Sequence, residues 1–153
     1  MFEVKPIGIV RSSRKDLADD FWGKVDAEII LADHLPDEAF AGLDGFSHVE
    51  VIFLMDRVDP AHVETGARHP RERMDWPMVG IFAQRGKARP NCIGLTRAAI
   101  RKVAGRVLTV RGLDAIDGTP VLDIKPWMME FAPIGETRQP QWATELMADY
   151  YKD

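Results

Sequence analysis

The chain has 153 residues, of which 46% are hydrophobic and 29% charged, with a formal net charge of −4. This length fits a single globular domain with one core, and the composition excludes a disordered chain. A single cysteine, Cys92, excludes an internal disulfide, and neither a signal peptide nor a membrane-spanning apolar run is found, so we expect a cytoplasmic protein.

The first third of the chain predicts three strands, over residues 5–10, 25–31 and 47–55. The third of these is the most apolar and is expected to be central. A short helix is expected over residues 36–42, because the segment has Pro at its start, acids in the first turn and Gly at its end. Residues 11–23 are mostly polar and predict a long loop with Phe21 and Trp22 at its tip.

The middle of the chain carries the basic segments. Residues 56–77 have little periodicity and include Arg68–Arg73, and a loop of this length tends to be functional or mobile. Residues 78–96 predict a buried strand over 79–83, a basic loop and a second strand. Arg85, Lys87 and Arg89 alternate along that loop and suit an anionic or electron-rich ligand, although a solvated hairpin loop is an equal alternative.

The last third predicts a hairpin of residues 93–103 and 106–113 around Ala104–Gly105, with a helix over 96–102 as the alternative. A strand is expected over 121–125. The spacing of Trp142, Leu146 and Tyr150 predicts an amphipathic helix over about 140–150. The fold class is therefore mainly β: one domain over residues 1–153, a small β-barrel with short helices and a C-terminal amphipathic helix, its core spanning about 5–130.

Few catalytic motifs are present. The four histidines lack metal-ligand spacing and one cysteine cannot build a zinc site, so no metal is expected. Cys92 is expected to be a small buried residue. Glycine-rich nucleotide loops and a G-x-S-x-G nucleophile turn are missing. The acidic balance gives no global field for nucleic acid, so tRNA could bind only through a local basic patch, at residues 68–73 or 85–89.

Two polar constellations remain. The first is the basic loop with Asn91, and the second is a group of acids near turns, Asp114, Asp117 and Asp123, with Lys125. Asp123 and Lys125 are two residues apart and share one face of a strand. They either pair structurally or both face a site.

Several motifs occur together in register. They are Ile7–Ser12, Gly42–His48, Arg68–Arg71, Val79–Arg85, Arg89–Leu95 and Leu113–Pro126. This combination resembles the TsaA-like (TrmO) family over about residues 5–130. The resemblance implies a homodimeric S-adenosylmethionine-dependent methyltransferase built on a small β-barrel, with the cofactor near the subunit interface. It also implies N6-methylation of threonylcarbamoyl-adenosine at tRNA position 37.

The resemblance further implies residue roles. The donor pocket should involve Asp56, Arg57, Arg85, Leu95, Arg111, Gly112, Leu113 and Asp114, the last four through their backbone. The catalytic and acceptor side should involve Asp123, Lys125 and Asn91, with Arg89, Pro90 and Arg71 in contact with the substrate. Asp123 is the candidate base for a proton on the acceptor nitrogen. The transfer itself mainly requires in-line alignment of donor carbon, sulfur and acceptor nitrogen.

The chain departs from the family pattern at one loop. Residues 19–23 stand where the tRNA enzymes carry a Pro-Arg-Gln-Pro-Gly-Leu type segment that contributes to the cofactor site. Two alternatives therefore stay open: a methyltransferase of a small-molecule acceptor, and a non-catalytic S-adenosylmethionine-binding module.

Overall fold

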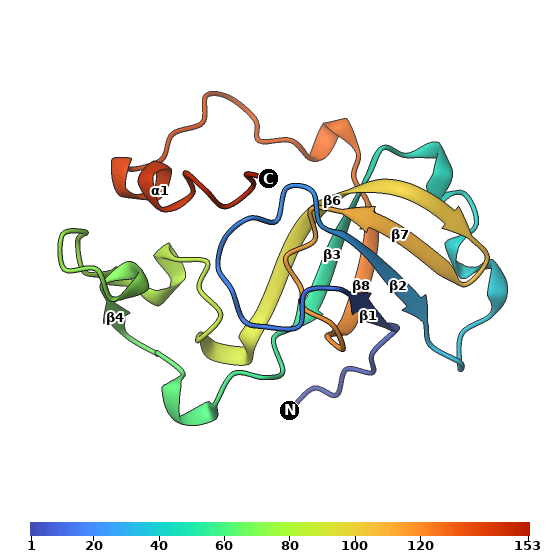
Figure 1. Ribbon diagram of the computed structural model, residues 1–153, viewed down its shortest axis with the longest axis horizontal. Helices are drawn as coiled ribbons and strands as arrows, with labels where there is room; N and C mark the ends of the chain where they lie inside the picture. The colour runs from blue at the N-terminus through green and yellow to red at the C-terminus, as the bar shows by residue number, and fades with distance from the viewer.

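Six antiparallel strands close into a barrel (Figure 1). The structure, a computed structural model, describes all 153 residues. The barrel strands are β1 (Gly8–Ser12), β2 (Asp26–Leu31), β3 (His48–Leu54), β6 (Ile93–Ala104), β7 (Val107–Arg111) and β8 (Pro120–Pro126). The expected small β-barrel is thus confirmed, and so is the strand rather than the helix over 96–102.

The barrel order is β1-β2-β7-β6-β3-β8, so that every strand has two partners and no edge is exposed. The closing contact is short: β1 meets β8 only through Gly8–Val121 and Ile9–Pro120. The hairpin between β6 and β7 turns at Gly105, whose φ of 58° lies in the left-handed region that favours glycine.

Side chains alternate between the barrel interior and its outer wall. In β3, Val49, Val51 and Phe53 are buried, while the residues between them lie on the outer wall. Fourteen buried residues from all six strands and adjoining loops form one core cluster. Gly94 of β6 is needed beside this core, because a Cβ there would lie 2.4 Å from the Phe53 ring.

Between β3 and β6 the chain leaves the barrel and forms a second lobe (Figure 1). The lobe contains a two-stranded sheet of β4 (Ala67–Arg68) and β5 (Val79–Gly80). The expected buried strand over 79–83 is wrong. Only Ile81 of its later residues is buried, and Phe82 is 74% exposed, because a 3₁₀ turn over Ile81–Ala83 replaces the strand. Periodicity cannot decide the structure of so short an apolar run.

The remaining helices are short. The 3₁₀ helices are Asp37–Phe40, Leu43–Gly45, Pro60–His62, Pro70–Glu72, Ile81–Ala83, Pro90–Cys92 and Met129–Phe131. The helix expected over 36–42 is therefore a 3₁₀ turn. The C-terminal helix α1 (Gln141–Leu146) ends four residues earlier than expected. None of the helices has the length and apolarity that a membrane crossing needs.

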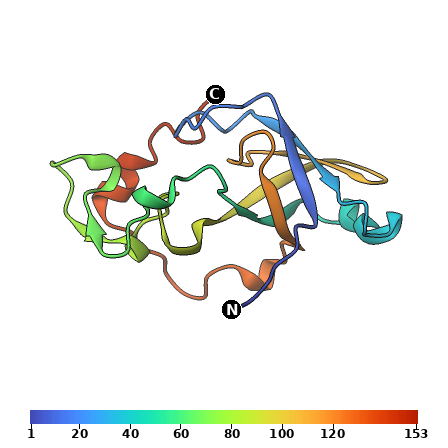
Figure 2. The same ribbon diagram turned by 90° about the horizontal axis from the view of Figure 1, so that it is seen from below.

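The C-terminal segment ties the lobe to the barrel. On the lobe side, Trp76 Nε1 donates to Glu145 Oε2 of α1 at 2.8 Å. After α1 the chain runs beside the long loop between β1 and β2, as Figures 1 and 2 both show. There the amides of Phe21 and Trp22 donate to the carbonyls of Asp149 and Tyr150 at 3.1 and 2.8 Å. The tail thereby lies across one end of the barrel.

Candidate functional site

A polar cluster forms where the tail crosses the barrel rim. Arg85 Nη2 donates to the carbonyl of Leu95 at 2.6 Å, which joins the basic loop to the first residues of β6. The next residue, Thr96, donates its hydroxyl to one carboxylate oxygen of Asp114, and the Tyr150 hydroxyl donates to the other. We call Arg85, Leu95, Thr96, Asp114 and Tyr150 the rim cluster.

The two tyrosines of the tail are electrostatically coupled to this cluster. Burial raises the pKa of Tyr150 well above its ordinary value, and the adjacent Asp114 carboxylate raises it further. The pKa of Tyr151 is raised by the same two causes, burial first, and is opposed by the positive charge of Arg85. Tyr150 therefore stays protonated and remains a hydrogen-bond donor at neutral pH.

The segment after β7 offers backbone groups rather than side chains. Arg111 uses Nε and Nη2 on the Asp26 carboxylate at 2.7 and 2.9 Å, and these hydrogen bonds lower the pKa of Asp26. Gly112 has a φ of 84°, and Leu113 is fully buried in the core. The amide of Asp114, a partly exposed residue, donates no hydrogen bond within the chain, so it is available to a ligand.

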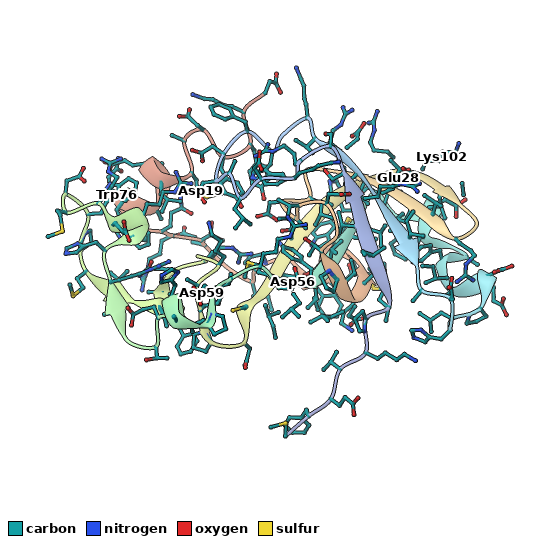
Figure 3. All side chains as sticks on the ribbon, turned by 60° about the horizontal axis from the view of Figure 1, so that its bottom comes forward. Asp19, Glu28, Asp56, Asp59, Trp76 and Lys102 are labelled. Carbon is teal, nitrogen blue, oxygen red and sulfur yellow. The ribbon has the colours of Figure 1, made fainter.

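An open cleft of about 530 Å³ is lined by residues 13–16 and 18–21 of the β1–β2 loop. Its volume lies in the range of small-molecule sites. It does not coincide with the donor residues named from the sequence, but its Asp19 is close enough to the tail to help raise the pKa of Tyr150. The labelled Asp19 lies between the barrel and the lobe in Figure 3.

Asp56 and Arg57 lie apart from the rim cluster. Both are exposed just after β3, and Arg57 donates to the carbonyls of Lys15 and Asp117 at 3.3 and 3.2 Å. Arg57 thus fixes the loop that lines the cleft. The place of Asp56 and Arg57 in a donor pocket stays a prediction.

The structure brings the two basic segments together. Gln84 Nε2 donates to the carbonyls of Arg68 and Val79 at 3.1 and 3.0 Å, which holds the basic loop on the β4–β5 sheet. Two of the six Arg and Lys side chains in these segments pair with acids of the β1–β2 loop. Arg71 forms a two-pronged ion pair with Asp20 at 2.9 and 3.2 Å, and Lys87 lies 3.7 Å from Asp19.

The turn at Arg89-Pro90-Asn91 is rigid and strained. Asn91 and Cys92 have φ angles of 65° and 49°, in a region that side-chain-bearing residues rarely adopt. Arg89 Nη1 anchors the turn by donating to the Gln84 carbonyl at 2.6 Å. Cys92 is only half-buried, and its thiol donates to the Arg89 carbonyl at 3.3 Å, so the expectation of a buried small residue is only partly met.

Asp123 and Lys125 form an ion pair at 2.9 Å on the outer wall. Asp123 lies opposite Ile52 of β3, and Ile52 lies opposite Leu95 of β6. Two strand spacings, about 10 Å, therefore separate Asp123 from the rim cluster along the wall. The pair shares a face, as its spacing indicated, but it does not touch the other site residues.

Thr96, Tyr150 and Asp20 could not be identified as site residues from any local sequence pattern. The sequence pattern predicts Thr96 only as part of a strand and Tyr150 only as part of an amphipathic helix face. Their contacts with Asp114 and Arg71 span 18, 36 and 51 residues, which no local pattern encodes. No group of three or more His, Cys, Asp or Glu side chains is arranged to hold a metal ion.

Comparisons with known proteins agree on one family. Residues 19–132 match the tRNA-methyltransferase O N-terminal domain. A tRNA (adenine(37)-N6)-methyltransferase from Homo sapiens is 37% identical over 115 residues, which are 75% of this chain and 24% of the relative. A probable S-adenosyl-L-methionine-binding protein from Methanothermobacter thermautotrophicus is 33% identical over 135 residues, 86% of this chain and 94% of the relative.

The solved structures agree with the sequence matches. TrmO from P. aeruginosa superimposes with a TM-score of 0.74 at 26% identity, covering 93% of this chain and 62% of that structure. The chain thus spans about a quarter of the human relative and under two thirds of this TrmO chain.

Proposed function

The chain belongs to the family of the tRNA-methyltransferase O N-terminal domain, and we propose that it transfers a methyl group from S-adenosylmethionine to N6 of adenine 37 in tRNA. We infer further that the acceptor is the threonylcarbamoyl form of that adenosine, as the resemblance of its motifs implies. The observation that carries the proposal is the rim cluster, which brings Arg85, Leu95 and Asp114 together at one end of the barrel.

The groups at the rim fit the donor's chemistry. Arg85 uses only Nη2 on Leu95, so its other N–H groups can hold a carboxylate. Asp114 accepts two hydroxyls but keeps lone pairs for a ribose hydroxyl or an ammonium group. The free amide of Asp114 suits the edge of an adenine ring. S-adenosylmethionine, when bound, supplies an activated methyl group on a sulfonium.

The chain's own contribution is alignment and, in this proposal, removal of a proton. The strained Arg89-Pro90-Asn91 turn presents a fixed surface to the acceptor, and Arg71 lies in the same lobe. Asp123 accepts the proton that the acceptor nitrogen loses, and the ion pair with Lys125 orients its carboxylate. The exposed position of Asp123 on the outer wall leaves it open to an incoming RNA.

A homodimer in the cytoplasm is part of the proposal. Ile93 and Leu95 are 45% and 41% exposed on the outer wall, opposite Leu54 and Ile52 of β3. An apolar wall next to the rim cluster suits a second copy of the chain, and it would place the donor near the subunit interface. Sedimentation equilibrium of wild type and Leu95→Glu tests this part: a dimer that the substitution leaves intact would refute the wall as the interface.

The direct test of the activity is mass spectrometry of tRNA nucleosides. The purified chain is incubated with S-adenosylmethionine and tRNA from a strain that lacks the enzyme. We expect N6-methylated threonylcarbamoyl-adenosine to accumulate only with the donor present. If the tRNA carries threonylcarbamoyl-adenosine and no methylated form of it appears, the acceptor assignment is refuted.

A second candidate is a donor-binding module without transfer activity. The match to 94% of a relative described only as an S-adenosyl-L-methionine-binding protein favours it. The ion pairs that neutralise Arg71 and Lys87 also reduce the charge available to RNA. Donor binding combined with no methyl transfer to tRNA would favour this candidate over the enzyme.

A further inference from the structure

We propose that Arg68, held against Gly86, binds a backbone phosphate of the tRNA and is the phosphate-binding side chain of the lobe. The proposal rests on the proposed function, because it names the residue that meets the same acceptor. Neither the family match nor the motif resemblance assigns a role to this side chain.

Arg68 lacks the partners that a half-buried guanidinium needs. Its Nε atom is buried and makes no hydrogen bond, and the side chain forms no ion pair. A guanidinium stays charged at any physiological pH, and the two terminal nitrogens of Arg68, unlike Nε, remain accessible to solvent. No group of the chain occupies them, so they are available to an acceptor from outside the chain.

The neighbouring cations are already engaged. Arg71 pairs with Asp20, Lys87 with Asp19, and Arg73 with Asp75. In β4, by contrast, the carbonyl of Arg68 is bound by Gln84 while its guanidinium is left free. Arg85 and Arg89 donate to backbone carbonyls, so Arg68 is the one basic side chain of the two segments whose guanidinium makes neither an ion pair nor a hydrogen bond.

Gly86 provides the space in which the guanidinium lies. A Cβ built on Gly86 would be only 2.6 Å from Arg68 Nη2, so any larger residue would displace the guanidinium. The absence of a side chain at this position in the basic loop therefore keeps the guanidinium against the backbone. Gly86 lies between Arg85 and Lys87 in sequence, so the Arg68 guanidinium lies against the basic loop.

Phosphate is the anion that best fits this arrangement. A guanidinium fork binds two oxygens of a phosphate with parallel hydrogen bonds, and tRNA presents phosphates along its whole surface. The donor carboxylate is the less suitable partner, because Arg85 already lies in the rim cluster while Arg68 belongs to the β4–β5 sheet of the lobe.

The test measures how the affinity of the full chain for a tRNA transcript depends on salt. Arg68→Met is compared with Arg101→Met, which removes the same charge from an exposed position in β6 near the hairpin tip. Lys102, the neighbour of Arg101, lies at the opposite end of the molecule from Trp76 of the lobe in Figure 3. Melting temperature and affinity for S-adenosylmethionine are measured on both variants.

For Arg68→Met we expect about tenfold weaker tRNA binding near physiological salt. The slope of log K against log salt should fall by about one, as for the loss of one phosphate contact. Arg101→Met should leave both quantities close to wild type, and donor affinity should be unchanged in both variants. An unchanged slope in Arg68→Met would overturn the proposal. A loss of donor affinity would also overturn it, in favour of a carboxylate contact.

Gly86→Ala provides a second variant that keeps the total charge. The added methyl should displace the Arg68 guanidinium and weaken tRNA binding severalfold, whereas Gly86→Ala combined with Arg68→Met should bind no more weakly than Arg68→Met alone. Additive losses would overturn the assignment. If wild type neither binds nor methylates tRNA, the proposed function itself fails; if wild type methylates tRNA but Arg68→Met keeps its slope, only this inference fails.

Discussion

The hydrogen bond from Tyr150 to Asp114 holds the C-terminal tail on the barrel rim, and its removal should release the tail. Tyr150→Phe keeps the ring and its burial but deletes the hydroxyl that donates to the carboxylate. A hydrogen bond to a charged group contributes about 1.5–3 kcal/mol. The free energy of opening the tail should fall by that amount, which raises the equilibrium constant for opening by a factor of about 10–150.

Amide hydrogen exchange measures this opening at one position. The amide of Trp22 donates to the Tyr150 carbonyl at 2.8 Å, and the Trp22 side chain is 2% exposed, so its exchange reports release of the tail. Tyr151→Phe is the matched control, because the Tyr151 hydroxyl makes no hydrogen bond while its ring stands edge-on to Tyr150, with ring centroids 5.0 Å apart. Equal protection of Trp22 in wild type and Tyr150→Phe would refute the reasoning.

The same contact predicts a dependence on pH. The pKa of Tyr150 is raised in the folded protein, so its contribution to stability is complete below the unfolded value near pH 10. The contribution is lost as the pH rises above that value toward the folded pKa. The difference in melting temperature between wild type and Tyr150→Phe should therefore narrow from pH 9 to pH 11. A difference that grows over this interval would contradict the assigned direction.

Three further substitutions test other parts of the structure. Gly23→Ala should release the tail as Tyr150→Phe does, since its Cβ would lie 1.9 Å from the Tyr151 carbonyl oxygen; unchanged Trp22 exchange would contradict this contact. Leu108→Ala should lower the free energy of unfolding by about 2–5 kcal/mol in urea denaturation, because Leu108 is fully buried in the core, and a loss below about 1 kcal/mol would be inconsistent with that core. Asp20→Asn should tighten tRNA binding in low-salt titrations by freeing Arg71, at a stability cost of about 1.5–3 kcal/mol because the pair is largely buried; weaker binding would show that Arg71 does not face RNA.

The barrel could be predicted from the sequence because its signals are local. In β3 the side chains alternate between buried and outward positions along seven residues, and the β6–β7 hairpin has glycine at the turn where the backbone needs a positive φ. These patterns report directly which face of a strand is buried. The motifs that mark the family lie mostly on these strands and on the loops that join them.

The lobe and the tail could not be predicted in the same way. The apolar run at 79–83 contains one buried residue, and its strand pairs outside the barrel. That strand has only two residues, which is too short for an alternation of buried and exposed side chains to be recognised. The site also depends on pairs that are distant in sequence. Asp20 meets Arg71 and Tyr150 meets Asp114 only because the β1–β2 loop and the tail cross the same rim.

Binding of S-adenosylmethionine to the rim cluster can be measured by isothermal titration of the full chain, with Arg85→Ala as the paired variant. We expect saturable binding at one site per chain, weakened about tenfold or more in Arg85→Ala because a charged contact to the donor is lost. The assignment of the donor site to the rim would be contradicted if wild type showed no binding heat. It would also be contradicted if Arg85→Ala bound S-adenosylmethionine as tightly as wild type.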